Sequence, residues 1–148
     1  MPPREPKIVA FLCHWCAYDG ADAAGRARLD LPPHVREVRV MCSGQVDPGM
    51  ILKAFDAGAD GVMVLGCQPG DCHYKEGNVH ALKRMLLLQA VLKQTRISPE
   101  RVRLDWISAG QAQRYAQVVH DMVKTISAVG PLAMPEGVLE ADARGEKA

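Results

Sequence analysis

The chain has 148 residues, 48% of them hydrophobic, and its 18 basic and 17 acidic side chains leave a formal net charge of +1. This length and composition predict one soluble globular domain, and the balanced, scattered charge argues against nucleic acid or an anionic membrane surface as a partner. No apolar run reaches the ~18 residues of a membrane-spanning helix, and the first residues lack the apolar middle of a secretory signal. We therefore expect a cytoplasmic protein with no membrane partner.

The first third of the chain predicts two strands with a helix between them. An apolar run with β-branched members over 8–12 is typical of a strand buried on both faces. A helix over about 21–29 follows and ends before Pro32, because proline disfavours helical backbone in the residue before it. The run over 35–40 mixes apolar and charged side chains, which predicts a less buried strand.

The middle of the chain repeats this alternation. Asp47 and Pro48 are typical of an N-cap and the first position of a helix, and Gly58 is a typical stop. The fully apolar run over 61–65 predicts a second central strand. A long helix is expected over about 78–95.

The last predicted elements complete an α/β pattern. Residues 102–106 alternate in the way of an exposed edge strand, and Ser108 with Gln111 resembles a capping box that opens a final helix closing at Gly130. The chain therefore predicts a single doubly wound α/β domain with a four-stranded parallel sheet and helices on both faces. Because the first and third runs are the most apolar, we expect the strand order 2-1-3-4.

We expect residues 1–130 to form this domain and to carry the functional site. Residues 131–148 combine a few apolar side chains with proline, glycine and charged residues. This segment is predicted to be a C-terminal tail that is either mobile or docks a partner.

All five cysteines come just after predicted strands. Cys13 and Cys16 follow the first strand, Cys42 follows the second, and Cys67 and Cys72 follow the third. In a doubly wound sheet, ligands bind beyond the carboxyl ends of the strands, where the winding reverses. The sequence therefore predicts a site between the first and third strands, with Cys42 alongside.

Thiolates that converge from separate loops can hold zinc or an iron–sulfur cluster. A 2Fe–2S cluster needs four ligands, two on each iron, so one cysteine would be surplus. Zinc would take four cysteines, or three and a histidine such as His14 or His73. Gly44, Gly66 and Gly70 would let backbone N–H groups approach the sulfurs.

The Cys13-x-x-Cys16 spacing by itself has another interpretation. Near a βαβ pattern it can indicate a thiol–disulfide oxidoreductase. That interpretation leaves three further cysteines without a role. The sequence offers no Gly-rich phosphate fingerprint after the first strand and no Ser/His/Asp set, so we predict no catalytic residues.

Segments 10–16, 40–44 and 65–74 resemble the delta-subunit family of methyl-viologen-reducing hydrogenases, and the similarity covers roughly residues 7–128. The resemblance implies a non-catalytic electron-transfer subunit with a 2Fe–2S cluster. It implies as partners a hydrogenase or formate dehydrogenase module and the flavin subunit of a heterodisulfide reductase complex. A structural zinc-binding interaction module remains the alternative. The resemblance implies that four of five cysteines bind the cluster: Cys13, Cys16, Cys42, Cys67 and Cys72.

Overall fold

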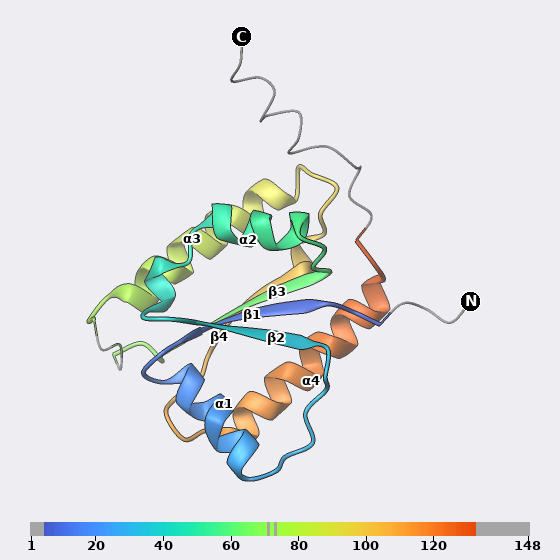
Figure 1. Cartoon of the computed structure of the whole chain (residues 1–148). Helices are drawn as coiled ribbons and strands as arrows, with labels where there is room; N and C mark the ends of the chain where they lie inside the picture. Colours follow the sequence, from blue (N-terminus) through green and yellow to red (C-terminus); the bar gives the residue numbers. More distant parts are fainter. Residues whose placement is uncertain (1–4, 71, 73, 133–148) are drawn as a thin grey trace.

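A computed structural model describes residues 5–70, 72 and 74–132, and it confirms the predicted alternation of strands and helices (Figure 1). The predicted tail lies outside these residues from position 133 onward. The elements, in chain order, are β1 (Ile8–Cys13), α1 (Ala17–Arg26), β2 (Val35–Val40), the short 3-10 helix η1 (Ser43–Gln45), α2 (Pro48–Asp56), β3 (Gly61–Gly66), α3 (Gly77–Leu92), the 3-10 helix η2 (Pro99–Arg101), β4 (Val102–Trp106) and α4 (Ala112–Val129).

The four strands form one parallel sheet in the order β2-β1-β3-β4, which confirms the prediction. The reason is burial: β3 is buried at every residue and β1 at all but one, whereas most of β2 is exposed. Cys13 pairs with Val40, and Leu12 pairs with Leu65. The carboxyl ends of β1, β2 and β3 therefore meet at one edge of the sheet.

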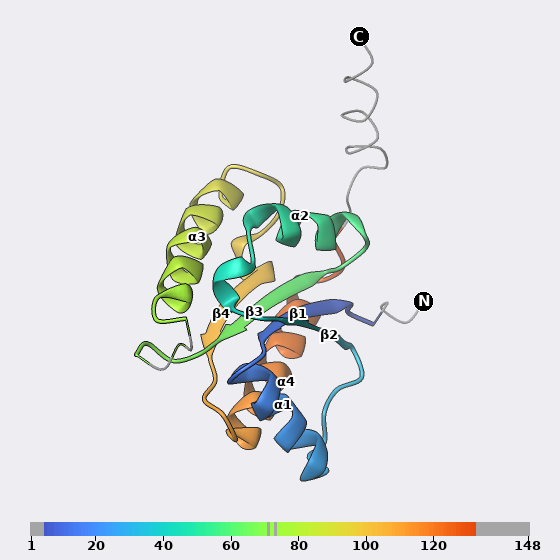
Figure 2. The same cartoon turned by 60° about the vertical axis from the view of Figure 1, so that its left-hand side comes forward.

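Two helices cover each face of the sheet. Figures 1 and 2 show α2 and α3 on one face and α1 and α4 on the other. Within the described residues, no helix is long and apolar enough to cross a membrane. Alternate residues of β1 and β3 enter two separate cores. The first core, beneath α1 and α4, includes Ile8, Leu12, Met63, Leu65, Tyr115 and Met122, and the second, beneath α2 and α3, includes Phe11, Phe55, Val62, Val64, Met85 and Leu88.

Helix α1 begins at Ala17, four residues earlier than predicted. The N–H of Gly20 donates to the Cys16 carbonyl at 2.9 Å, so the helical turn follows directly after the second cysteine. A Cβ on Gly20 would lie 2.9 Å from Ile107 Cγ2. The absence of a side chain at Gly20 therefore lets α1 pack closely against the segment before α4.

The beginnings of α2 and α4 differ in how well the sequence predicted them. Asp47 caps α2 as predicted, since its Oδ1 accepts from the Met50 N–H at 2.9 Å. At α4, Gln111 Oε1 accepts from the Ser108 N–H at 2.9 Å, which is one half of a capping box. The helix nevertheless starts only at Ala112 because residues 108–111 form a turn.

The end of the sheet opposite the cysteines is held by a buried aspartate. Asp60 Oδ2 accepts from the Lys7 N–H at 2.9 Å, and Oδ1 accepts from the Leu132 N–H at 3.0 Å. Arg101, also buried, donates to the Asp60 carbonyl at 3.0 Å. One residue thus joins the beginning of β1, the approach to β4 and the segment after α4.

Candidate metal centre

Three cysteines meet where β1 and β3 end. Cys13 is the last residue of β1 and Cys67 follows β3 directly, and the parallel pairing of these strands brings their Sγ atoms to 3.5 Å. Cys16, which directly precedes α1, lies close enough to Cys67 for its thiol to raise the pKa of the Cys67 thiol. All three side chains are buried. The structure therefore brings together, as predicted, the cysteines that follow the first and third strands.

The other two cysteines form a pair beside this group. Cys42 lies between β2 and η1, and Cys72 lies in the connection from β3 to α3, with their Sγ atoms 3.9 Å apart. Cys42 contacts Cys72 directly, which the sequence did not predict. Electrostatic interaction with the nearby Cys13 also contributes to raising the pKa of the Cys42 thiol. The five thiols thus form a group of three and an adjacent pair.

Backbone N–H groups point at several of these sulfurs. Ala17 N–H donates to Cys13 Sγ at 3.3 Å, and Gly44 N–H donates to Cys42 Sγ at 3.4 Å. Burial tends to raise the pKa of Cys72, but hydrogen bonds from backbone N–H groups around the start of α3 outweigh it, so the pKa of this thiol is lowered. Such donors stabilise sulfur in its thiolate form.

The pKa shifts of Cys67 and Cys42 favour the protonated thiol. Burial raises the pKa of Cys67, and the neighbouring thiols of Cys16 and Cys13 raise it further. Burial also raises the pKa of Cys42, despite the Gly44 N–H. Several thiolates this close together repel one another in a buried site unless a cation neutralises them. The donor set therefore fits a metal group that would hold the thiols deprotonated.

Two glycines allow the loops around the pair to approach closely. A Cβ on Gly77, the first residue of α3, would lie 2.0 Å from Cys42 Sγ and 3.3 Å from Cys72 Sγ. A Cβ on Gly44 would lie 2.8 Å from the Gly77 carbonyl oxygen. The sequence predicted a role at the sulfurs for Gly44 but none for Gly77, which lies at the start of α3, five residues after a cysteine.

The other two predicted glycines have structural roles of their own. Gly66 makes room for the hydroxyl of Ser43, because a Cβ there would lie 2.6 Å from Ser43 Oγ. Gly70 has φ +92° with open space around its missing Cβ, so it serves the turn after β3.

Asn78 is a site residue that the sequence reasoning missed. Its buried side-chain Nδ2 donates to the carbonyls of Cys67 and Gln68 at 3.0 and 2.9 Å. These bonds tie the segment after β3 to the first turn of α3. An asparagine at the start of a helix, six residues after a cysteine, was the signal that could have identified it.

An open surface with large side chains adjoins the cysteines. Trp15, Met41 and Tyr74 are 42%, 46% and 48% exposed, and Trp15 Nε1 donates to Tyr74 Oη at 3.4 Å. A cavity of about 670 Å³ is lined by Met41, Cys42, Tyr74, Gly77 and His80, among others. The Cys42–Cys72 pair therefore lies just beneath a surface that a protein partner can reach.

The structure describes one of the two histidines that were predicted as possible zinc ligands, His14 but not His73. His14 packs its ring edge-on against Trp15 at 5.0 Å, and its buried Nδ1 has no hydrogen-bond partner in the described part of the chain. His73 lies outside the described residues. Over residues 5–70, 72 and 74–132, no three Cys, His, Asp or Glu side chains are arranged to hold one metal ion.

Comparison with known proteins gives a consistent picture. The family described as methyl-viologen-reducing hydrogenase, delta subunit, matches residues 8–130. The chain is 46% identical over 138 residues to the iron-sulfur D subunit of the vhc F420-non-reducing hydrogenase of Methanococcus voltae, covering 93% of this chain and 96% of that protein. It is 51% identical over 127 residues to the iron-sulfur D subunit of the F420-non-reducing hydrogenase of Archaeoglobus profundus, covering 86% and 93%.

A third relative is a much longer protein. The A subunit of the ferredoxin/F420H2-dependent CoB-CoM heterodisulfide reductase of Methanosarcina acetivorans is 44% identical to this chain over 127 residues. The match covers 86% of this chain but 16% of that protein. A domain similar to this one is thus part of a longer heterodisulfide reductase polypeptide in that organism.

Proposed function

The chain belongs to the methyl-viologen-reducing hydrogenase delta subunit family, and from this membership we propose that it is a non-catalytic electron-transfer subunit carrying a 2Fe–2S cluster. It relays electrons between a hydrogenase or formate dehydrogenase module and the flavin subunit of a heterodisulfide reductase complex. The observation that carries this proposal is the convergence of five thiols from three strand ends. The names of the relatives, iron-sulfur subunits of hydrogenases and the A subunit of a heterodisulfide reductase, support it.

Four of the five cysteines hold the cluster, two on each iron. The two Sγ contacts support one choice of pairs: Cys13 with Cys67 at 3.5 Å, and Cys42 with Cys72 at 3.9 Å. Cys16 is then the surplus thiol, a close neighbour that raises the pKa of the Cys67 thiol. The bound cluster supplies a one-electron redox couple.

The protein positions most of these cysteines in a buried site and donates backbone hydrogen bonds to their sulfurs. Backbone N–H groups donate to the sulfurs of Cys13, Cys42 and Cys72, which lowers the cost of placing thiolates in a buried site. The exposed Trp15 and Tyr74 lie beside the pair, where a partner can approach. Because clustered reduced thiols persist in a reducing compartment, we place the protein in the cytoplasm.

Single Cys→Ser variants at all five positions test the ligand set. Each is reconstituted anaerobically with iron and sulfide, and bound iron, acid-labile sulfide and the visible spectrum are measured. We expect Cys16→Ser to keep a full cluster and the other four variants to lose most of it. Full loading in any of those four would contradict the assignment, and unchanged loading in all five would refute the cysteine site itself.

A further inference from the structure

The side chain of Asn78 is a buried amide that uses both of its donors and its acceptor oxygen. It is 1% exposed. Its Nδ2 donates to the carbonyls of Cys67 and Gln68 at 3.0 and 2.9 Å, and its Oδ1 accepts from the Val79 N–H at 2.9 Å. A shift of this residue would leave several buried polar groups without partners, which is costly. These bonds therefore fix the position of the backbone at Asn78.

The backbone that Asn78 fixes is the start of α3, which lies against the cysteine pair. A Cβ on Gly77, the first residue of this helix, would lie 2.0 Å from Cys42 Sγ and 3.3 Å from Cys72 Sγ. Glu76, at the N-cap, makes no side-chain hydrogen bond to the first turn. The first N–H groups of a helix have no partner within it, and this end carries a partial positive charge. The start of α3 therefore favours negative charge on the two sulfurs.

The thiol of Cys72 shows the effect of this placement. Burial by itself raises the pKa of this thiol, but backbone hydrogen bonds, of which the one at Asn78 counts most, outweigh burial, so the pKa is lowered. The pKa values of Cys42 and Cys67 are raised instead, with burial as the largest cause. Of these three cysteines, Cys72 is the one whose surroundings favour the thiolate, and the start of α3 is the reason.

Asn78 therefore connects the two pairs of the proposed ligand set. Its side chain holds the carbonyl of Cys67, and its backbone lies at the start of α3 beside Cys72. One-electron reduction adds a negative charge to a cluster, so N–H donors at a ligand sulfur stabilise the reduced form and raise the potential. We propose that Asn78 is a positioning residue that raises the reduction potential of the cluster by holding the first turn of α3 at the Cys72 sulfur. This inference rests on the proposed function.

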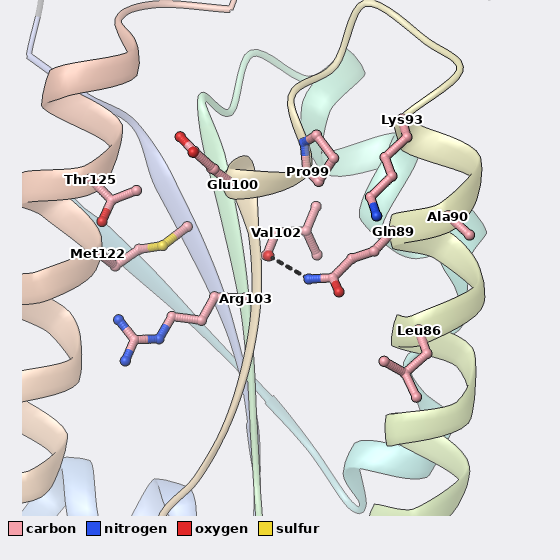
Figure 3. Close-up of a pocket in the computed structure, with 10 residues that line it drawn as sticks. All are labelled: Leu86, Gln89, Ala90, Lys93, Pro99, Glu100, Val102, Arg103, Met122 and Thr125. Atoms are coloured by element: carbon pink, nitrogen blue, oxygen red, sulfur yellow. Dashed lines mark hydrogen bonds between the residues drawn. The ribbon is translucent and has the colours of Figure 1, made fainter.

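The far half of α3 is held by a similar but separate hydrogen bond. Gln89 Nε2 donates to the carbonyl of Val102 in β4 at 3.4 Å, at the groove drawn in Figure 3. Gln89 lies 11 residues after Asn78, a rise of about 16 Å along the helix. Both amides tie α3 to a backbone carbonyl outside the helix, but Asn78 does so beside the sulfurs and Gln89 far from them. Gln89→Ala is therefore a matched control for Asn78→Ala.

The first test compares reduction potentials. Full-length wild type, Asn78→Ala and Gln89→Ala are reconstituted anaerobically with iron and sulfide, and the midpoint potential of the loaded fraction is measured by redox titration followed by EPR. In Asn78→Ala we expect a potential at least ~59 mV below that of the wild type, which is a tenfold change in the ratio of reduced to oxidised cluster. Gln89→Ala should change this ratio less than ~2-fold. A wild-type potential in Asn78→Ala, or an equal shift in both variants, would overturn the role of Asn78.

A second test needs the wild-type chain alone, so it decides the matter even where Asn78→Ala takes up no cluster. Asn78 is the one asparagine of the chain, so asparagine labelled with heavy nitrogen in its backbone marks a single atom. In the reduced, cluster-loaded protein, pulsed EPR should show a coupling between the electron spin and this nitrogen. A loaded cluster without that coupling would overturn the inference.

The outcomes separate this inference from the proposed function. Bound iron and acid-labile sulfide are measured in every sample. A wild-type chain that binds neither would refute the proposed function and this inference with it. A wild-type cluster that lacks the nitrogen coupling, or whose potential is the same in Asn78→Ala, would refute this inference alone. Circular dichroism melts confirm that both variants are folded.

Discussion

Replacing Gly77 with alanine tests how closely α3 approaches the cysteine pair. The new Cβ would lie 2.0 Å from Cys42 Sγ, where ordinary van der Waals contact is about 3.5–4 Å. The sulfur must therefore move by more than about 1 Å, which changes its 3.9 Å contact with Cys72 Sγ. Overpacking of this kind costs about 1–3 kcal/mol, while alanine gains up to about 1 kcal/mol over glycine in a helix. We expect a net loss of about 1–2 kcal/mol in the free energy of unfolding, with most of the cluster lost.

Gly25→Ala is the matched control. Gly25 lies in α1, and a Cβ there would meet nothing within 4 Å, so this change should be neutral or stabilise the protein by up to about 1 kcal/mol. Both variants and the wild type are unfolded in urea as reduced, cluster-free chains, and iron is then measured after reconstitution. If Gly77→Ala unfolds at the wild-type urea concentration and binds iron fully, the reasoning about this contact is refuted.

Three further changes probe the rest of the fold. Asp60→Ala removes the acceptors for the Lys7 and Leu132 N–H groups, so it should lower the free energy of unfolding by about 2–4 kcal/mol. The amount of iron bound after reconstitution should stay unchanged, and a loss of iron would contradict the separation of Asp60 from the cysteine site. Asn78→Ala should cost about 1–3 kcal/mol and reduce iron binding, and unchanged iron would count against its role in holding the cysteine segment. Burial raises the pKa of Tyr115 above its ordinary value of 10.0, so the folded state keeps a proton that the unfolded chain releases at higher pH. This stabilisation is complete below pH 10, and above pH 10 it is lost by up to about 1.4 kcal/mol per pH unit. In urea unfolding at increasing pH, the free energy of unfolding should therefore fall less steeply in Tyr115→Phe than in the wild type. Equal dependence on pH in the two proteins would refute this.

The sheet was predictable because burial differs strongly among the strands. Apolar side chains at consecutive positions, as over 61–65, require cover on both faces, which places that strand in the centre. The charged residues within 35–40 place β2 at an edge for the same reason. Helix starts were harder to predict, since α1 begins directly after Cys16 with no side-chain cap hydrogen bond to mark its first residue.

The meeting of the cysteines was predictable from topology, but their pairing was not. Parallel strands with a common edge bring Cys13 and Cys67 together once the order 2-1-3-4 is known. The contact of Cys42 with Cys72 depends on how the connection after β3 folds back to Gly77, and no local pattern specifies that path.

The proposed 2Fe–2S relay is tested most directly by reconstituting the full chain anaerobically with iron and sulfide and recording its EPR spectrum before and after reduction. We expect about two irons and two acid-labile sulfides per chain, and a paramagnetic signal that appears on one-electron reduction. Stoichiometric zinc with neither iron nor acid-labile sulfide would contradict the relay.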